Sequence, residues 1–214
     1  MNKEEFINYL KELEIDITEE QLEQLDKYYK ILIEWNEKIN LTRIIEEKEV
    51  YLKHFYDSLT LIKVINLNQV KTLCDVGTGA GFPGIVLKIV FPNLKVTLID
   101  SLQKRVTFLN EVIKKINLKD IEAKHCRGEE HKGQYEVVTS RAVANIEKLV
   151  NYTMHLVSND GVFIAMKGNL EKELTPEVEK KLKNKYQIVK IEEFYLPIEK
   201  SKRSLVVIKN KENM

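Results

Sequence analysis

Apolar residues in the first third of the chain recur at helical spacing. The residues of this pattern are Leu22, Leu25, Tyr29, Leu32 and Ile39. Before them, Thr18 and Gln21 have the spacing of a capping box, in which two side chains bond back to the backbone at a helix start. Asn2 and Glu5 have the same relation one helix earlier. Because three- and four-residue steps place these positions on one helix face, the pattern predicts a helical N-terminal extension over residues 1–68.

From about residue 71 the pattern changes, and short β-rich runs alternate with amphipathic runs. The predicted strands are residues 71–76, 95–100, 121–126, 135–140, 161–168, 186–196 and 204–210. The predicted helices between them are residues 83–91, 102–117, 145–157 and 174–185. This alternation is typical of an α/β fold with a mostly parallel sheet and helices on both faces. The last two strands lack a helix between them, so we expect a seven-stranded sheet with an antiparallel edge hairpin, in a second unit over residues 69–214.

Composition limits the classes of function without choosing one. The chain has 214 residues and 34 Lys and Arg against 33 Asp and Glu, so its net charge of +1 does not itself indicate a nucleic-acid partner. Any basic surface must come from local segregation of charge. Cys74 and Cys126 lack the spacing of a zinc site and are too few for a disulfide framework, so we expect two reduced thiols and no metal. The charged N-terminus and the absence of a run of about 20 apolar residues predict a soluble cytoplasmic protein that does not enter a membrane.

A glycine-rich stretch follows the first predicted strand of the sheet. Residues 74–84, CDVGTGAGFPG, hold four of the eight glycines of the chain. A loop that leaves a strand and opens a helix is where open α/β sheets bind ligands. Gly79, Gly81 and Gly84 also match the three spaced glycines of a dinucleotide fingerprint. The stretch therefore indicates a nucleotide cofactor.

Two residues of this stretch favour S-adenosylmethionine over a dinucleotide. Pro83 lacks the N–H that a pyrophosphate would use at the helix start. Asp75 ends the strand with a carboxylate, which repels a pyrophosphate and attracts the cationic groups of S-adenosylmethionine. Phe82 can form an apolar wall for the methionine end. The predicted cofactor contacts of the stretch are Asp75, Gly77, Gly79, Gly81 and Phe82. The alternative for Asp75 is a loop-capping role.

Further candidate contacts follow the later strands. Asp100 ends the second strand about 20 residues past the glycines, where a carboxylate can accept both ribose hydroxyls. Its alternative is a cap on the helix from Leu102. Gly128 and Glu129 follow the third strand and can cover an adenine; the alternative, which the segment taken alone favours, is a simple turn. The fourth strand runs into residues 139–145, TSRAVAN, without the Asn-Pro-Pro-aromatic turn of methyltransferases that act on exocyclic amines.

Several of these segments together resemble one family. The stretches EWNEKINLT, HFYDSL, DVGTGAGFPG, LIDSLQKRVTFL, CRGEE, VVTSRAVA and MKG occur in its order and spacing, and they cover the chain nearly end to end. The chain is similar to the ribosomal RNA small subunit methyltransferase G family, also called glucose-inhibited division protein B. The resemblance implies a Rossmann-like class I methyltransferase domain, S-adenosylmethionine as the cofactor and methylation of N7 of a guanine in 16S ribosomal RNA.

By position, the resemblance implies cofactor contacts at a defined set of residues. These are Gly77, Phe82, Gly128, Glu129 and Arg141. One departure is the residue before Glu129, which is often alanine or another small apolar residue in the family and is Gly128 here. The implied partner is 16S ribosomal RNA or the small ribosomal subunit, and we expect the protein to act as a monomer.

The chemistry of guanine N7 predicts a site without an acid–base pair. N7 is a bare acceptor without a proton, so its attack on a methyl group needs no general base and depends on proximity and orientation. Arg141 and Lys167 are expected to orient the substrate. The candidates for binding RNA are Arg43, Lys53, His54, Lys104, Arg105 and Lys167. The alternatives are solvated surface charges, a structural role for His54 and a core position for Trp35.

Two rival functions remain open from the sequence. One is a methyltransferase of the same fold that acts on a small molecule or a protein. The other is a regulator that binds a dinucleotide without catalysis. Pro83 and the final hairpin argue against the regulator.

Overall fold

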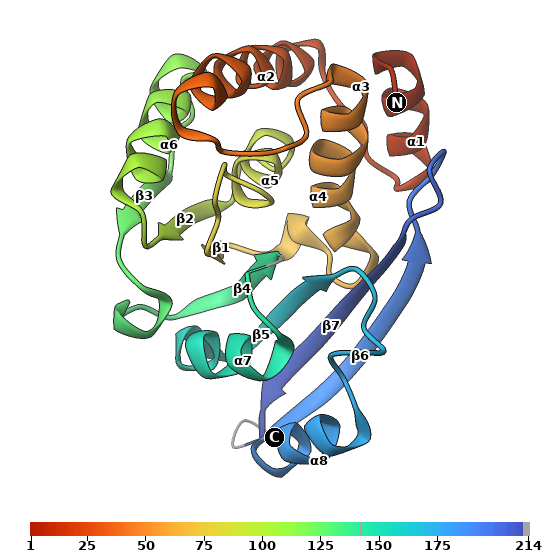
Figure 1. The fold of residues 1–214 in the computed structure, drawn as a ribbon, viewed down its shortest axis with the longest axis vertical. Helices are drawn as coiled ribbons and strands as arrows, with labels where there is room; N and C mark the ends of the chain where they lie inside the picture. Colours follow the sequence, from red (N-terminus) through yellow and green to blue (C-terminus); the bar gives the residue numbers. More distant parts are fainter. Residues whose placement is uncertain (142, 212–214) are drawn as a thin grey trace.

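A twisted seven-stranded sheet forms the centre of the computed structural model, which describes residues 1–141 and 143–211 (Figure 1). Its strands are β1 (Thr72–Val76), β2 (Lys95–Asp100), β3 (Ile121–His125), β4 (Tyr135–Arg141), β5 (Val157–Lys167), β6 (Tyr186–Tyr195) and β7 (Lys202–Asn210). They lie in the order β3-β2-β1-β4-β5-β7-β6. The predicted α/β class and the strand-helix alternation are confirmed.

The first five strands are parallel, and the final hairpin is antiparallel as predicted. β7 lies one place in from the edge, where it is antiparallel to both β5 and β6. Lys167 at the end of β5 pairs with Ser204 near the start of β7. Phe194 near the end of β6 pairs with Arg203. The carboxyl ends of the parallel strands and the turn end of the β6–β7 hairpin therefore meet at one end of the sheet.

Helices cover both faces of the sheet (Figure 1). On one face lie α2 (Glu19–Ile39), α5 (Gly84–Val90) and α6 (Gln103–Lys115), and on the other lie α7 (Ile146–Thr153) and α8 (Pro176–Lys185). The apolar side chains form one cluster on each side. Leu25, Leu87 and Leu109 belong to the first cluster, whereas Leu149 and Leu182 belong to the second. α5, α6, α7 and α8 contact strands of the sheet, whereas α2 packs on α5 and α6.

Both predicted capping boxes are present in the N-terminal helices. Asn2 caps α1 (Lys3–Glu12) and Thr18 caps α2, each with its reciprocal side-chain bond. Phe6, Leu25 and Tyr28 of these helices lie in the same apolar cluster as the sheet. The division into units 1–68 and 69–214 stays a prediction, and residue 214 lies outside the described residues.

A π-helical segment interrupts the helix that precedes the sheet. The chain runs through α3 (Glu47–Val50), the π-helix η1 (Tyr51–Tyr56), α4 (Asp57–Leu59) and the 3₁₀ turn η2 (Thr60–Lys63). π-helical turns are uncommon and frequently mark functional sites. Here the wider turn carries His54 and precedes Asp57, and both side chains are buried.

The remaining elements are short 3₁₀ turns, and some predicted bounds change. The turns are η3 (Leu67–Gln69), η4 (Gly128–Glu130) and η5 (Met154–Leu156). The predicted helix 145–157 ends earlier, and β5 begins at Val157 because η5 turns the chain into the sheet. Cys74 lies buried in β1, and Cys126 follows β3; both are free thiols. In the described part of the chain, no helix has the length and apolar character needed to span a membrane.

Candidate active site

A cavity of about 680 Å³ opens at the edge where the strands end. Its lining comes from the loop after β1, the ends of β2, β4 and β5, the β6–β7 hairpin and the π-helical segment. Pockets for small molecules commonly have volumes of about 300–1,000 Å³. The volume and position therefore suit a cofactor and part of a substrate.

The glycine loop forms one end of this cavity. The backbone N–H groups of Gly77 and Thr78 both donate to the carbonyl of Ile99, at 2.8 and 3.1 Å, and this ties the loop to β2. Gly77 and Gly79 have positive φ angles of 70° and 61°, which only glycine adopts without cost. Both line the cavity, whereas Gly81 does not. Within the described residues, a Cβ on Gly79 would have no neighbour within 4 Å, so the loop leaves open space there.

Asp75 lies beneath this loop and outside the cavity lining. Its Oδ2 atom accepts hydrogen bonds from Thr78 Oγ1 at 2.6 Å and from the N–H of Gly84 at 2.8 Å. Burial raises the pKa of Asp75 to about 6. The expected direct contact with a cation is therefore corrected: the start of α5 covers the carboxylate, which orders the loop, as in the alternative reading of the sequence.

Asp100 lies at the cavity and also bonds to the backbone at the start of α6. It lines the cavity, and its Oδ1 atom accepts from the N–H of Leu102 at 2.9 Å, before α6. Its Oδ2 atom accepts from the N–H of Gly79 at 2.9 Å and lies 3.3 Å from Arg105 Nη1. Arg105 also lines the cavity, but this ion pair turns part of its guanidinium toward the protein. The carboxylate thus joins β2 to the glycine loop.

The aromatic ring of Phe82 lines the cavity under other side chains. The His54 ring stacks on it, with centroids 4.3 Å apart and an interplanar angle of 20°. The guanidinium of Arg141 lies 5.1 Å from the centroid of the Phe82 ring, and the centroid of the Tyr28 ring lies 5.4 Å from it. The predicted apolar wall is therefore a layer of several side chains.

His54 holds the N-terminal extension against β4. Its Nε2 atom lies 3.0 Å from Thr42 Oγ1, and its Nδ1 atom lies 3.1 Å from Arg141 Nη2. The Nδ1 atom also lies 3.1 Å from the carbonyl oxygen of Lys53, so this ring nitrogen contacts both an acceptor and the donor Arg141. Burial, and then the charge of Arg141, lowers the pKa of His54 to about 3. The ring is therefore neutral and takes the structural role, so His54 adds no positive charge for RNA.

Asp57 lies between two arginines and was given no role from the sequence. Its Oδ2 atom is 3.1 Å from Arg141 Nη1, and its Oδ1 atom is 3.0 Å from Arg203 Nε. Arg141 Nη1 also donates to the carbonyl of Lys53 at 3.0 Å. All four residues line the cavity. One buried carboxylate thus joins the π-helical segment to β4 and β7.

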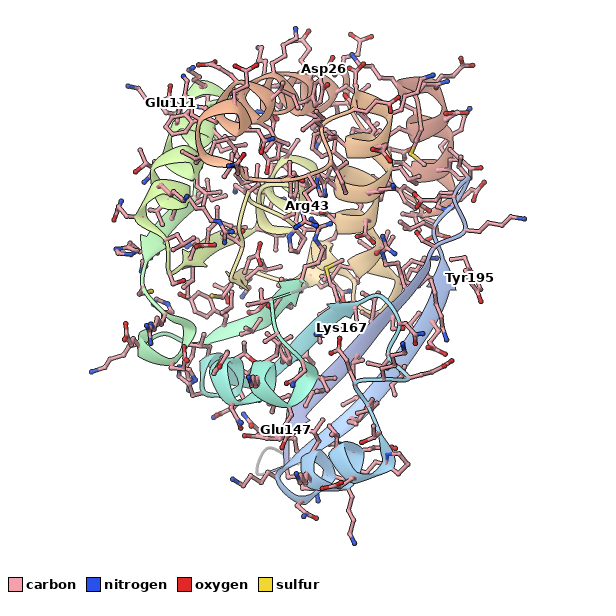
Figure 2. The ribbon with its side chains drawn as sticks, in the orientation of Figure 1. Asp26, Arg43, Glu111, Glu147, Lys167 and Tyr195 are labelled. Atoms are coloured by element: carbon pink, nitrogen blue, oxygen red, sulfur yellow. The ribbon has the colours of Figure 1, made fainter. Side chains whose placement is uncertain are left out.

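The other predicted residues divide by position. Lys167 lies at the end of β5 (Figure 2), lines the cavity, donates to the carbonyl of Ala144 and pairs with Glu173 at 2.8 Å. Lys53 also lines it. Besides Asp75 and Gly81, four predicted residues lie outside the lining: Gly128, which is buried, and Arg43, Lys104 and Glu129, which are exposed. The ring of Trp35 packs against that of Phe108, with centroids 5.8 Å apart, which agrees with the predicted core position of Trp35.

Among the described residues, no group of three or more His, Cys, Asp or Glu side chains is arranged to hold a metal ion.

Solved structures of low sequence identity share this fold. A "SAM dependent methyltransferase" from Aquifex aeolicus superposes with a TM-score of 0.58 at 18% identity, over 76% of this chain and 93% of that one. A "ribosomal protein L11 methylase" from Lactobacillus delbrueckii subsp. bulgaricus gives a TM-score of 0.55 at 18% identity, over 78% and 80%. These likenesses support the Rossmann-like class I methyltransferase architecture.

Sequence relatives extend over nearly the whole chain. The family model for rRNA small subunit methyltransferase G matches residues 21–206. The "Ribosomal RNA small subunit methyltransferase G" of Bacillus pumilus (strain SAFR-032) is 45% identical over 99% of this chain and 91% of that protein. The protein of the same name from Bacillus subtilis (strain 168) is 44% identical over 100% and 92%. The resemblance seen in the sequence is confirmed, and the chain belongs to the rRNA small subunit methyltransferase G family.

Proposed function

We propose that this protein transfers the methyl group of S-adenosylmethionine to N7 of a guanine in 16S ribosomal RNA. The observation that carries the proposal is a cavity in which the glycine loop and Asp100 face cationic side chains, in a chain of this family. In this proposal the protein acts as a monomer in the cytoplasm, on ribosomal RNA or the small subunit.

The residues at one end of the cavity fit the cofactor. Gly79 leaves open space, and the carboxylate of Asp100 borders the same cavity, where it can accept ribose hydroxyls. Gly77 and the Phe82 layer would hold the methionine end. When bound, S-adenosylmethionine supplies a methyl group activated by its sulfonium. The chain supplies orientation around it.

The charges of the cavity suit RNA. Within the described residues, the cationic lining side chains are Lys53, Arg105, Arg141, Lys167 and Arg203, and the anionic ones are Asp57 and Asp100. Glutamates outside the lining pair with the two lysines: Glu49 and Glu199 with Lys53, and Glu173 with Lys167. Phosphate groups provide the largest sequence-independent part of nucleic-acid binding. The five cationic side chains offer donors to phosphate groups, and the family of the chain, rather than a net charge of the site, favours an RNA substrate.

The arrangement also suits an acceptor that carries no proton. Guanine N7 has a free lone pair in the major groove, so no residue has to remove a proton. His54 is neutral and already bonded on both ring nitrogens. The carboxylates of Asp57 and Asp100 are paired with arginines. Catalysis by these residues would come from holding the acceptor base in line with the methyl group.

Mass spectrometry of 16S ribosomal RNA tests the function. Cells without this gene should lack one 7-methylguanosine that the parent cells carry. The wild-type gene should restore it, and so should a matched variant, Asp160→Ala, at an exposed position far from the cavity lining. Asp100→Ala should not restore it. An unchanged level of 7-methylguanosine in the deletion strain would refute the proposal.

Two further measurements separate the rival functions. Methyl transfer to free guanosine as efficient as transfer to ribosomal RNA would favour a small-molecule enzyme. A thermal-shift assay with NADH and S-adenosylmethionine side by side distinguishes the dinucleotide-binding regulator. We expect stabilisation by S-adenosylmethionine only.

A further inference from the structure

The β6–β7 hairpin lines the end of the cavity that lies furthest from Asp100. Asp100 ends β2, and β1, β4 and β5 separate β2 from β7 in the sheet. At about 4.8 Å for each strand step, β7 lies about 19 Å from β2. If the ribose of the cofactor lies at Asp100 and its methionine end at the loop after β1, the methyl acceptor must enter from the side of β5 and β7. This step rests on the proposed function.

Two neighbouring side chains of the hairpin face this part of the cavity. Phe194 and Arg203 are direct cross-strand partners, and such partners project from the same face of a sheet. Both line the cavity. Phe194 is half-buried, and the ammonium of Lys63 lies 5.2 Å from its ring centroid. Proteins that act on unstacked RNA bases hold them on aromatic rings and by hydrogen bonds to the base edges.

The guanidinium of Arg203 is fixed in orientation. Its Nε atom donates to Asp57 Oδ1 at 3.0 Å, and its Nη1 atom donates to the carbonyl of Lys202 at 3.0 Å. Among the described residues, Nη2 has no hydrogen-bond partner. The protein therefore holds two of the three guanidinium nitrogens, and Nη2 remains as a donor for a ligand of the cavity that Arg203 lines.

A donor at this place distinguishes the two purines. Guanine carries the acceptor O6 beside N7, whereas adenine carries the N6 amine, which is a donor. An arginine can donate a hydrogen bond to O6 of guanine, but it cannot bond to the N6 amine of adenine, because both groups are donors. We propose that Phe194 and Arg203 form the subsite for the acceptor base, where Phe194 stacks on a guanine turned out of the RNA and Arg203 Nη2 donates to its O6.

Steady-state kinetics of Phe194 variants test the stacking contact. The substrates are S-adenosylmethionine and small ribosomal subunits from cells that lack the gene. Phe194→Leu should lower kcat/KM for the subunits about 5- to 150-fold, the range that corresponds to about 1–3 kcal/mol for one stacked base. Phe194→Tyr, which keeps the ring, should stay within about threefold of the wild type.

The matched control is the adjacent aromatic residue of the same strand. Tyr195 is 65% exposed, lies outside the cavity lining and is seen at the outer side of the hairpin (Figure 2). Tyr195→Leu should leave kcat/KM unchanged. Calorimetry should give wild-type affinity for S-adenosylmethionine in every variant, which a general disturbance of the fold would not. A Phe194→Leu enzyme with wild-type kcat/KM would overturn the subsite.

The choice of base tests Arg203. Once mass spectrometry has identified the methylated position, RNA with guanine or adenine at that position is compared. Arg203→Met should lower kcat/KM for the guanine RNA and bring it closer to kcat/KM for the adenine RNA. Arg203→Lys should retain part of the preference for guanine. An unchanged ratio of these two kcat/KM values in Arg203→Met would overturn the assignment of Arg203. Wild-type protein that methylates no small-subunit RNA would overturn the proposed function and the subsite with it.

Discussion

Among the described residues, Asp57 is the single carboxylate that contacts both Arg141 and Arg203, and it follows directly on a π-helical turn. The arginines come from β4 and β7, which are separated in the sheet by β5. An acidic side chain in this position fixes two guanidinium groups that would otherwise repel each other. Its role at the site is therefore to hold the two guanidinium groups in place, and these groups neutralise its charge.

Loss of the charge at Asp57 should destabilise the protein. Asp57→Asn leaves two largely buried guanidinium groups without a counterion, and breaking a buried pair costs about 3–5 kcal/mol. We expect a decrease of this order in the free energy of unfolding, measured with urea. Asp160→Asn, at an exposed position, is the control and should change it little. An equally stable Asp57→Asn protein would contradict the importance of the network.

Asp75 should make stability depend on pH with an unusual sign for an acid. Its pKa is raised from 3.8 to about 6 in the folded state. Below pH 3.8 the carboxyl is protonated in both the folded and unfolded states, and above pH 6 it is ionised in both. Between these values the folded state holds the proton more tightly, so ionisation lowers stability as the pH rises.

Asp75→Asn cannot ionise and removes this contribution. The free energy of unfolding of the variant minus that of the wild type should rise between about pH 4 and pH 6 and then level off. The expected rise is on the order of 3 kcal/mol, at about 1.4 kcal/mol for each pKa unit. Chemical denaturation at several pH values measures it. A constant difference across this range would show that the carboxyl titrates alike in both states.

At the scale of elements, Gln21 connects two helices through one amide. Its Oε1 atom accepts from the N–H of Thr18 at 2.9 Å in the capping box of α2. Its Nε2 atom donates to the carbonyls of Ile89 and Val90 at 3.0 and 3.1 Å, at the end of α5. The start of one helix thus satisfies carbonyls that the end of the other leaves without partners.

This double role gives a prediction that capping alone would not. Glutamate suits the third position of a capping box as well as glutamine does. Gln21→Glu nevertheless loses both donors and places a carboxylate against the carbonyls of α5. We expect the free energy of unfolding to fall by about 1–3 kcal/mol. Thr18→Ser keeps both the cap and Gln21 and should change stability by less than about 0.5 kcal/mol. A Gln21→Glu protein with the free energy of unfolding of the wild type would mean that the contact with α5 does not contribute to stability.

Elements with a strong periodic pattern could be predicted from the sequence, and the π-helix could not. The strands and the capping boxes follow from local spacing, because each segment contains its own signal. The π-helical turn at residues 51–56 has no such local signal, and His54 and Asp57 contact Arg141, which lies 87 and 84 positions further along the chain. Phe194 and Arg203 escaped notice because the register of the hairpin brings them to the site.

The same limit applies to individual site residues. Gly77, Gly79 and Asp100 line the cavity. They could be predicted because the sequence shows that they lie at the ends of strands. Asp75 also follows this pattern, but the folding of the loop over the start of α5 buries it, and no spacing rule shows that. The family resemblance supplied the substrate class, which neither composition nor periodicity contains.

At the scale of the whole molecule, the N-terminal helices and the sheet share one apolar core. Phe6, Leu25 and Leu32 lie in one cluster with Leu87 and Leu98. A fragment of residues 69–214 would expose the side of this cluster that the helices cover. We expect the fragment to show no cooperative thermal transition by circular dichroism, whereas the full chain should show one. A cooperative transition in the fragment would establish residues 69–214 as an autonomous domain.

The stacking of the His54 ring on Phe82, described above, connects the cofactor loop to the extension, and so does the hydrogen bond that the Tyr28 hydroxyl donates to the carbonyl of Ala80. The loop and the helices that reach it through these contacts therefore tighten or loosen together. Thermodynamic reciprocity then links the affinity for the cofactor to the affinity for RNA. Whatever factor a bound cofactor adds to the affinity for RNA, RNA must add to the affinity for cofactor. After transfer, weaker binding of either product loosens the hold on the other.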